Sequence, residues 1–306
     1  MRSPDRGVIY TAIRKKYVRE AQLSAQSVRA FLPDVGIVLF TDCPPKLKGV
    51  FDNIVHLTKL NPVPHLDKLI CMRDSPFKKT LFLDTDTYVC GPLDGLFELL
   101  KDFDIAMALE RRYHDILPEG VGVPAAFCEF NQGVVAFRQS DQMKKMLQAS
   151  LHWAENYYAR VGTPTNDQVA MRIGLYFSGL RIATLPQEFN CRFHSFGYLN
   201  GKVKILHARI PGGKHTEKNL QTIVGKINRE AIPRVFVAGK VYALKRRRFL
   251  SVEHTFSKKS ATLFRPWRVL CKTLLQRIMK KVERRIQRLV KASTRLMTHL
   301  LAMRSE

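Results

Sequence analysis

Short apolar runs alternate with helical patterns along the first two thirds of the chain, and this alternation restricts the fold more than any other feature. Buried strands are predicted at residues 8–13, 37–40, 81–83, 105–109, 133–137, 181–185 and 203–206. Helical spacing of apolar residues predicts helices over 20–31, 66–73 and 142–158. Strands separated by helices are typical of an α/β fold in which helices flank one sheet.

Composition excludes several other classes of protein. Of the 306 residues, 45% are hydrophobic and 25% charged, which excludes a disordered, collagen-like or coiled-coil chain. The six cysteines include no C-x-x-C pair, which argues against a zinc ribbon, a thioredoxin-type site and a secreted disulfide framework. Residues 1–7 are polar and lack the apolar region of a signal peptide. We therefore expect a cytoplasmic protein in a reducing compartment.

The positive charge is concentrated at the C-terminal end. The chain carries a net charge of +25, and residues 240–306 hold 19 Lys and Arg against three acidic residues, a net +16. Residues 1–239 account for the remaining +9. This asymmetry predicts a mildly basic globular body and a strongly basic tail with separate roles.

Two carboxylates directly after a predicted strand form the sharpest local motif. Asp84 and Asp86 follow the apolar run 81–83 and are separated only by Thr85. Ligands of α/β sheets bind at the carboxyl ends of the strands, and two carboxylates one residue apart can both reach a hard divalent cation. A solvated pair in a loop is the alternative. A metal that holds a diphosphate would give this acidic pair a cationic partner.

A histidine follows another predicted strand. His207 comes after the apolar run 203–206 and precedes a Gly-rich stretch that ends in Lys214. A lone histidine is usually structural. In this position, however, it can bind a metal while the turn and the ammonium group contact phosphate.

Two amide-rich motifs have plain structural alternatives. The first, Asn131-Gln132-Gly133, lies where the strand over 133–137 begins, and a turn also explains it. The second, Asn166-Asp167-Gln168, lies at a helix start, where an N-cap also explains it.

Taken in order, these motifs resemble those of nucleotide-sugar-dependent glycosyltransferases of the GT-A fold. The similarity is to the family 8 type, which includes bacterial lipopolysaccharide galactosyl- and glucosyltransferases and glycogenin. It covers about residues 7–214. The motifs that carry it are Leu83-Asp84-Thr85-Asp86, Phe130-Asn131-Gln132-Gly133, Asn166-Asp167-Gln168, Leu185-Pro186 with Phe189-Asn190, and His207 with Lys214.

The resemblance implies a single GT-A (Rossmann-like) mixed sheet and a hexosyltransferase activity. The enzyme would move a sugar from a nucleotide-diphosphate sugar, such as a UDP-hexose, to a glycan, lipid-linked or protein acceptor, with retention of the anomeric configuration. Asp84, Asp86 and His207 would hold Mn²⁺ or Mg²⁺, which bridges the diphosphate. Such an ion stabilises the negative charge that develops on the leaving diphosphate.

The resemblance also assigns the remaining site residues. Lys68 takes the position of a basic residue that contacts the donor, with Arg73 as the alternative, and Lys214 matches a lysine that contacts the diphosphate. Other residues match positions around the sugar and its reacting carbon, namely Asn131, Asp167 and Gln168. Thr11, Ala12 and Tyr17 are candidates for contacts with the nucleotide.

Three other functions are alternatives to this one. A nucleic-acid-binding protein would fit the basic charge and the cluster 245–248, but no zinc-finger or RRM signature is present, so no specific nucleic-acid partner is expected. A sugar nucleotidyltransferase would need a Gly-rich basic loop after the first strand, and residues 13–16 contain no glycine. A catalytically inactive relative would not need the complete set of metal ligands.

The expected organisation has three parts. Residues 1–214 form the catalytic domain, and residues 215–264 a connecting region of undefined structure. From 265 to 304, apolar residues recur at helical spacing among many Lys and Arg, which predicts a basic amphipathic helix. It would bind an anionic membrane surface and keep a cytoplasmic enzyme on the inner face of the membrane, near lipid-linked acceptors such as lipopolysaccharide cores. Packing on the body or an oligomer seam are the alternatives.

Overall fold

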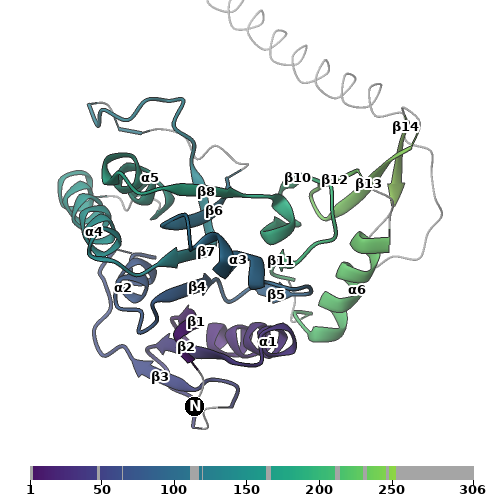
Figure 1. Cartoon of the computed structure of the whole chain (residues 1–306), viewed down its shortest axis with the longest axis horizontal. Coiled ribbons are helices and arrows are strands. Elements are labelled where there is room, and N and C mark those ends of the chain that lie inside the picture. The colour runs from purple at the N-terminus through teal and green to yellow at the C-terminus, as the bar shows by residue number, and fades with distance from the viewer. Residues whose placement is uncertain are drawn as a thin grey trace, which may run out of the picture. The chain divides into compact units, whose positions relative to one another are not determined.

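The computed structural model (Figure 1) describes residues 3–46, 49–63, 65–110, 117–118, 120–162, 167–210, 214–229, 233–245 and 248–252. The predicted helix over 265–304 lies outside these residues. Within them, no helix is long and apolar enough to cross a bilayer. Five of the cysteines are free: Cys43, Cys71, Cys90, Cys128 and Cys191.

A seven-stranded mixed sheet is the centre of the fold, as the sequence predicted. The strand order is β3-β2-β1-β4-β7-β6-β8. Strands β1 to β4 run parallel, β7 is antiparallel to both β4 and β6, and β8 is parallel to β6. The strands are β1 (Ser3–Ala12), β2 (Val35–Thr41), β3 (Asn53–His56), β4 (Lys79–Leu83), β6 (Ile105–Leu109), β7 (Phe130–Arg138) and β8 (Ile182–Leu185).

Helices cover both faces of this sheet. Side chains alternate between the faces along each strand. Val8 and Tyr10 of β1 therefore pack in one apolar cluster with α1 and α3, while Ile9 packs in a second cluster with α2, α4 and α5. The helices are α1 (Lys15–Phe31), α2 (Asp67–Arg73), α3 (Asp94–Leu99), α4 (Asp141–Val161), α5 (Asp167–Ser178) and α6 (Glu217–Arg229).

The best predicted helix, α4, has clear start and stop signals. The Ser140 hydroxyl accepts a hydrogen bond from the backbone N–H of Met143 at 3.1 Å, which caps the first turn. At the other end Gly162 adopts φ 72°, a left-handed conformation that glycine tolerates and that ends the helix.

The strand order places a crevice beside β1. The chain passes from β1 through α1 to β2 on one side, and reaches β4 on the other side after α2. The connections that follow β1 and precede β4 therefore lie on opposite sides of β1. In open α/β sheets, ligands bind at such a point, outside the carboxyl ends of the strands. Ala12 ends β1 and Leu83 ends β4, so Asp84 and Asp86 lie at this edge.

A three-stranded sheet brings residues 191–207 to the same edge. It has the order β5-β11-β9, with β5 (Thr87–Val89), β9 (Cys191–Arg192) and β11 (Ile205–His207). Strands β5 and β11 are antiparallel and pair Thr87 with His207. Residues more than a hundred positions apart in the sequence thus become neighbours.

Packing continues across residue 214, where the sequence predicted a connecting region. A four-stranded sheet has the order β10-β12-β13-β14, with β10 (Phe196–Leu199), β12 (Arg234–Val237), β13 (Lys240–Lys245) and β14 (Arg248–Val252). Leu220 and Ile227 of α6 are buried with Leu206 of β11 in a third apolar cluster. A short 3-10 helix, Gln187–Phe189, precedes β9.

Candidate metal centre

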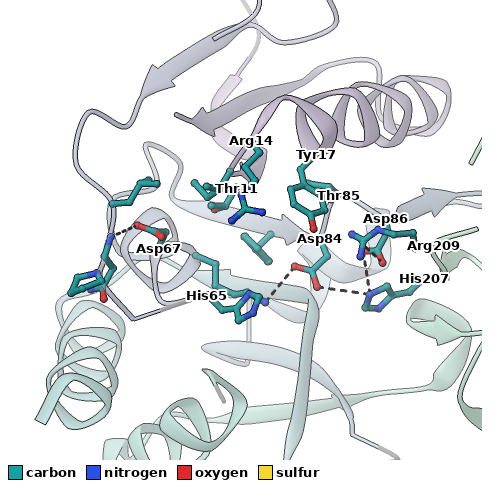
Figure 2. Close-up of a pocket in the computed structure, with 16 residues that line it drawn as sticks. Thr11, Arg14, Tyr17, His65, Asp67, Asp84, Thr85, Asp86, His207 and Arg209 are labelled. Carbon is teal, nitrogen blue, oxygen red and sulfur yellow. Dashed lines mark hydrogen bonds and ion pairs between the residues drawn. The ribbon is translucent and has the colours of Figure 1, made fainter. Parts of the chain in front are cut away.

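Three potential metal ligands meet at the carboxyl edge of β4. One ligand atom each from Asp84, Asp86 and His207 lies within 4.8 Å of the others (Figure 2). His207 Nε2 is 3.5 Å from Asp86 Oδ1 and 3.8 Å from Asp84 Oδ2. The backbone explains the convergence, because the Ala208 N–H donates to the Asp86 carbonyl at 3.0 Å, directly beside the pairing of β5 with β11.

A relay of two amides orients the His207 ring. The backbone N–H of Gly133 can only donate, so Asn131 Oδ1 accepts from it at 2.9 Å. The same oxygen accepts from Asn190 Nδ2 at 2.8 Å, which leaves Asn190 Oδ1 facing His207 Nδ1 at 2.8 Å. Nδ1 therefore carries the proton, and Nε2 faces the two aspartates.

This donor set fits a divalent cation. A neutral His207 presents its Nε2 lone pair to two carboxylates, and a cation among the three groups would remove the resulting repulsion. A histidine ligand whose second nitrogen donates to a fixed oxygen is the usual arrangement at metal sites.

Gly133 is required for space rather than for an unusual backbone angle. A Cβ atom at this position would lie 2.1 Å from His207 Cε1 and 2.6 Å from Nδ1. A turn was one explanation of this motif. Gly133 instead lies within β7, as the strand predicted over 133–137 requires, and its missing side chain admits the imidazole.

A cavity of about 590 Å³ opens beside the three ligands. Thr11 and Tyr17, two candidates for nucleotide contacts, line it together with Lys68 and Arg209. Figure 2 shows Thr11, Arg14 and Tyr17 on the side of the cavity formed by β1 and α1. The side chain of the third candidate, Ala12, is instead fully buried in the apolar cluster under α1, because successive residues of β1 point to opposite faces.

Lys68 connects the metal ligands to the residues expected at the sugar. Its Nζ lies 2.8 Å from Asp167 Oδ2 and 3.4 Å from Asp84 Oδ1. Burial lowers the pKa of Lys68, but Asp167 and Asp84 outweigh burial and raise this pKa above its usual value. The alternative donor contact, Arg73, pairs on the surface with Asp74 and donates to Gln148 at 2.6 Å.

Asn131, Asp167 and Gln168 form a buried polar network that does not line the cavity itself but meets it through the contact of Asp167 with Lys68. All three are almost fully buried. Gln168 donates to Glu129 at 2.6 Å and accepts from Asn131 at 3.3 Å. Asp167 also begins α5, as its motif predicted, and its carbonyl accepts from Gln132 at 2.8 Å. The structure brings the three residues together, but Asn131 also orients a metal ligand, which its motif did not indicate.

Lys214 was a candidate from the sequence, and Arg209 was not. Lys214 is exposed and is not among the described residues that line the cavity. Arg209 was not considered from the sequence, yet it lines the cavity and its Nη2 lies 3.6 Å from Asp86 Oδ2. The sequence signal that could have identified Arg209 is its spacing from His207, because residues two positions apart project to the same side of an extended chain.

Comparisons with known proteins give weak structural similarity. No protein-family model matches the sequence, and no curated protein matches it. The chain is similar to the galactosyltransferase LgtC in complex with donor and acceptor sugar analogues, with 16% identity, a TM-score of 0.48, and coverage of 72% of this chain and 95% of LgtC. It is also similar to the glycosyltransferase GlyE of Streptococcus pneumoniae TIGR4, with 19% identity, a TM-score of 0.44, and coverage of 62% of this chain but only 47% of GlyE. For the apo form of GlyE the TM-score is 0.47. These neighbours are glycosyltransferases, the class that the sequence motifs resemble.

Proposed function

We propose that this protein is a metal-dependent glycosyltransferase that uses a nucleotide-sugar donor. The observation that carries the proposal is the convergence of Asp84, Asp86 and His207 within 4.8 Å at the crevice beside β1. A polar cavity of about 590 Å³ adjoins these ligands, which is enough room for a sugar nucleotide by comparison with ordinary ligand sites. The five motifs that resemble GT-A glycosyltransferases agree with this assignment.

The proposed metal is Mn²⁺, with Mg²⁺ as the alternative. Carboxylate oxygens suit both ions, and an imidazole nitrogen favours a transition metal, so Mn²⁺ satisfies both ligand types. Bound there, the ion supplies Lewis-acid stabilisation for the negative charge on a leaving diphosphate.

The protein's own residues would bind and orient the donor around that centre. Thr11 and Tyr17 lie where the nucleoside of a UDP-hexose would enter, at the end of β1. Lys68 holds a positive charge between Asp84 and Asp167. Asp167 and Gln168 would stabilise positive charge at the anomeric carbon, as the resemblance implies for a reaction that retains configuration.

The acceptor and the location are proposed from the sequence. The acceptor is a glycan, a lipid-linked molecule or a protein. The basic C-terminal segment, outside the described residues, is proposed to bind anionic lipid at the cytoplasmic face of a membrane, where lipid-linked acceptors such as lipopolysaccharide cores are made. Residues 265–304 hold 12 Lys and Arg against one acidic residue, and this net charge of +11 supports the proposal.

Hydrolysis of the donor tests the proposed function. Purified protein with UDP-glucose or UDP-galactose and Mn²⁺ should release UDP slowly even without acceptor, and a chelator should stop the release. Asp86→Ala removes one ligand and should abolish both UDP release and Mn²⁺-dependent UDP binding. The chain offers a matched control, because Asp102-Phe103-Asp104 is a second D-x-D motif and Asp102 is exposed, away from the site. Asp102→Ala should behave like wild type. Absence of UDP release together with no heat of UDP binding would contradict the proposal.

A further inference from the structure

Arg209 lies where the metal ligands meet the cavity, yet no motif assigned it a role. It follows β11 and lines both the cavity of about 590 Å³ and a second cavity of about 300 Å³. Both cavities also include Asp86 and His207 in their walls. The guanidinium group is therefore beside the proposed metal and accessible to a ligand from two sides.

Contacts with Glu20 and Tyr17 hold the Arg209 side chain in place. Its Nε lies 3.1 Å from both carboxylate oxygens of Glu20, and its Nη2 lies 3.0 Å from Glu20 Oε2. The guanidinium carbon lies 5.1 Å from the centre of the Tyr17 ring. Thr85, between the two aspartates, donates its hydroxyl to Glu20 at 3.2 Å. Glu20 is itself buried, so its carboxylate has little freedom to move and fixes the position of the Arg209 guanidinium group.

The two carboxylate oxygens of Asp86 have different neighbours: one faces the proposed metal site and the other faces Arg209. Oδ1 is 3.5 Å from His207 Nε2, and Oδ2 is 3.6 Å from Arg209 Nη2. One carboxylate can thus bind a metal through Oδ1 and an arginine through Oδ2 at the same time. Figure 2 shows Arg209 directly beside Asp86. A fixed positive charge next to a divalent ion is a suitable site for a ligand with several negative charges.

We propose that Arg209 binds the diphosphate of the donor and that Glu20 positions it. This inference rests on the proposed function. Among the described residues, Nη1 of Arg209 has no hydrogen-bond or ion-pair partner. Glu20 accepts from Nε and Nη2, which leaves the Nη1 edge of the planar group for a phosphate oxygen.

Charge balance supports an additional cation at this point. A divalent ion would neutralise the charges of Asp84 and Asp86, so the diphosphate needs other positive groups. Lys68 contacts Asp84 and Asp167, and Arg209 contacts Glu20 and Asp86, so both cations are already paired with carboxylates. The guanidinium group of Arg209 differs in that its Nη1 still has no partner among the described residues. Lys214, which the resemblance assigned to the diphosphate, is exposed and is not among the described residues that line the cavity. Arg209 is the cation that the structure places beside Asp86 with a free edge toward the cavity.

Nucleotide binding to full-length variants tests this role. With Mn²⁺ present, Arg209→Gln should raise the dissociation constant of UDP by about tenfold or more, the effect expected from losing a charged hydrogen bond. The dissociation constant of uridine, which lacks phosphate, should not change. Arg209→Lys keeps the positive charge but lacks the planar set of N–H donors of a guanidinium group. Its affinity for UDP should therefore fall less than that of Arg209→Gln. Glu20→Gln weakens the support of the arginine and should also raise the dissociation constant of UDP and not that of uridine.

A matched arginine and a metal titration distinguish binding from a structural role. Arg138 pairs with Asp104 at the opposite end of β7, and its side chain is 38% exposed compared with 39% for Arg209. Arg138→Gln should bind UDP like wild type. Mn²⁺ affinity without nucleotide, measured by electron paramagnetic resonance, should not fall in Arg209→Gln.

Each contrary outcome has a clear meaning. Unchanged UDP binding in Arg209→Gln, or an equal loss for uridine, would overturn the role of Arg209 and leave the proposed function intact. A parallel loss of Mn²⁺ affinity would also overturn it, because the arginine would then act only through Asp86. If wild type itself binds no UDP with Mn²⁺, the proposed function fails and this inference fails with it.

Discussion

At the scale of single residues, the orientation of His207 depends on Asn190. Asn190 Oδ1 accepts a hydrogen bond from His207 Nδ1, and Asn190 Nδ2 donates a hydrogen bond to Asn131 Oδ1. Without its side chain the imidazole can rotate, and the proton is no longer kept on Nδ1. We therefore expect Asn190→Ala to weaken Mn²⁺ binding by about 10- to 100-fold, the range typical of residues that orient metal ligands. Electron paramagnetic resonance of free Mn²⁺ during a titration measures this change.

The chain contains a second contact between an asparagine and a histidine that serves as the control. Asn156 lies 2.9 Å from His152 Nε2 on the exposed face of α4. Asn156→Ala should leave the affinity for Mn²⁺ at the wild-type value. If Asn190→Ala also binds Mn²⁺ like wild type, the amide relay does not orient a metal ligand.

The residues of the candidate site were predictable where their position depends on a strand end. Asp84 and Asp86 follow β4, and His207 ends β11, so each could be placed at a sheet edge from the local sequence. The amide relay could not be predicted, because it joins three segments through contacts between distant residues. Arg209 was missed for a related reason, since its partner Glu20 lies 189 positions earlier in the chain.

At the scale of secondary structure, buried hydroxyl groups join α1 to the strands that carry the site. Ser24 of α1 contacts the Tyr10 hydroxyl at 3.0 Å and the Thr87 hydroxyl at 2.8 Å. Thr87 in turn donates to the Asp84 carbonyl at 2.8 Å. Burial raises the pKa of Tyr10 above its usual value, so this hydroxyl stays protonated. The chain of hydroxyls therefore links β1, α1 and β5 beneath the metal ligands.

Removing the central hydroxyl should destabilise the fold. Ser24→Ala leaves the hydroxyls of Tyr10 and Thr87 without their shared partner, and we expect a loss of about 1–3 kcal/mol in the free energy of unfolding. Urea denaturation measures this loss. Gln26 on the same helix is exposed, so Gln26→Ala should change the free energy of unfolding by less than about 0.5 kcal/mol. Equal stability of the two variants would exclude a contribution from the hydroxyl chain.

The predicted elements were correct where apolar runs or helical spacing are clear, and missing where the elements are short. The strands at 105–109 and 81–83 and the helix at 142–158 correspond to β6, β4 and α4. No strand was predicted for β3 or β5, and no helix for α3, because each of these elements has only three to six residues. Strand β5 in addition depends on a distant partner, β11. The apolar stretch 235–244 divides into β12 and β13 at a turn in which Ala238 and Gly239 have φ 47° and 80°.

At the scale of the whole molecule, sequence and structure divide the chain at different points. Apolar periodicity weakens after residue 213, and this suggested the end of the catalytic domain. In the structure, α6, β12 and β13 complete an apolar cluster with residues of β5 and β11. The proposed active site therefore rests partly on residues beyond 214. The division that remains is one of charge, +9 for residues 1–239 and +16 for residues 240–306.

That concentration of charge predicts selective binding to anionic membranes. From the sequence, the apolar positions between 270 and 296 would contact acyl chains while Lys and Arg contact lipid headgroups, at roughly 1 kcal/mol for each basic residue near the surface. Full-length protein should co-sediment with vesicles that contain phosphatidylglycerol and much less with neutral phosphatidylcholine vesicles. A truncation ending at Phe264 should lose this binding. Added salt should weaken it, because exposed charges are screened.

A full-length variant separates charge from chain length in this test. Arg284→Glu, Arg285→Glu and Arg288→Glu together keep the apolar positions and reverse the charge at three sites. If electrostatic attraction holds the segment on the membrane, this triple variant should bind anionic vesicles far more weakly than wild type and should still release UDP from the donor in solution. Equal binding of wild type to neutral and anionic vesicles, or full binding by the truncation, would show that the segment is not a membrane anchor. Packing on the body or association between copies would then be the remaining explanations for its apolar stripe.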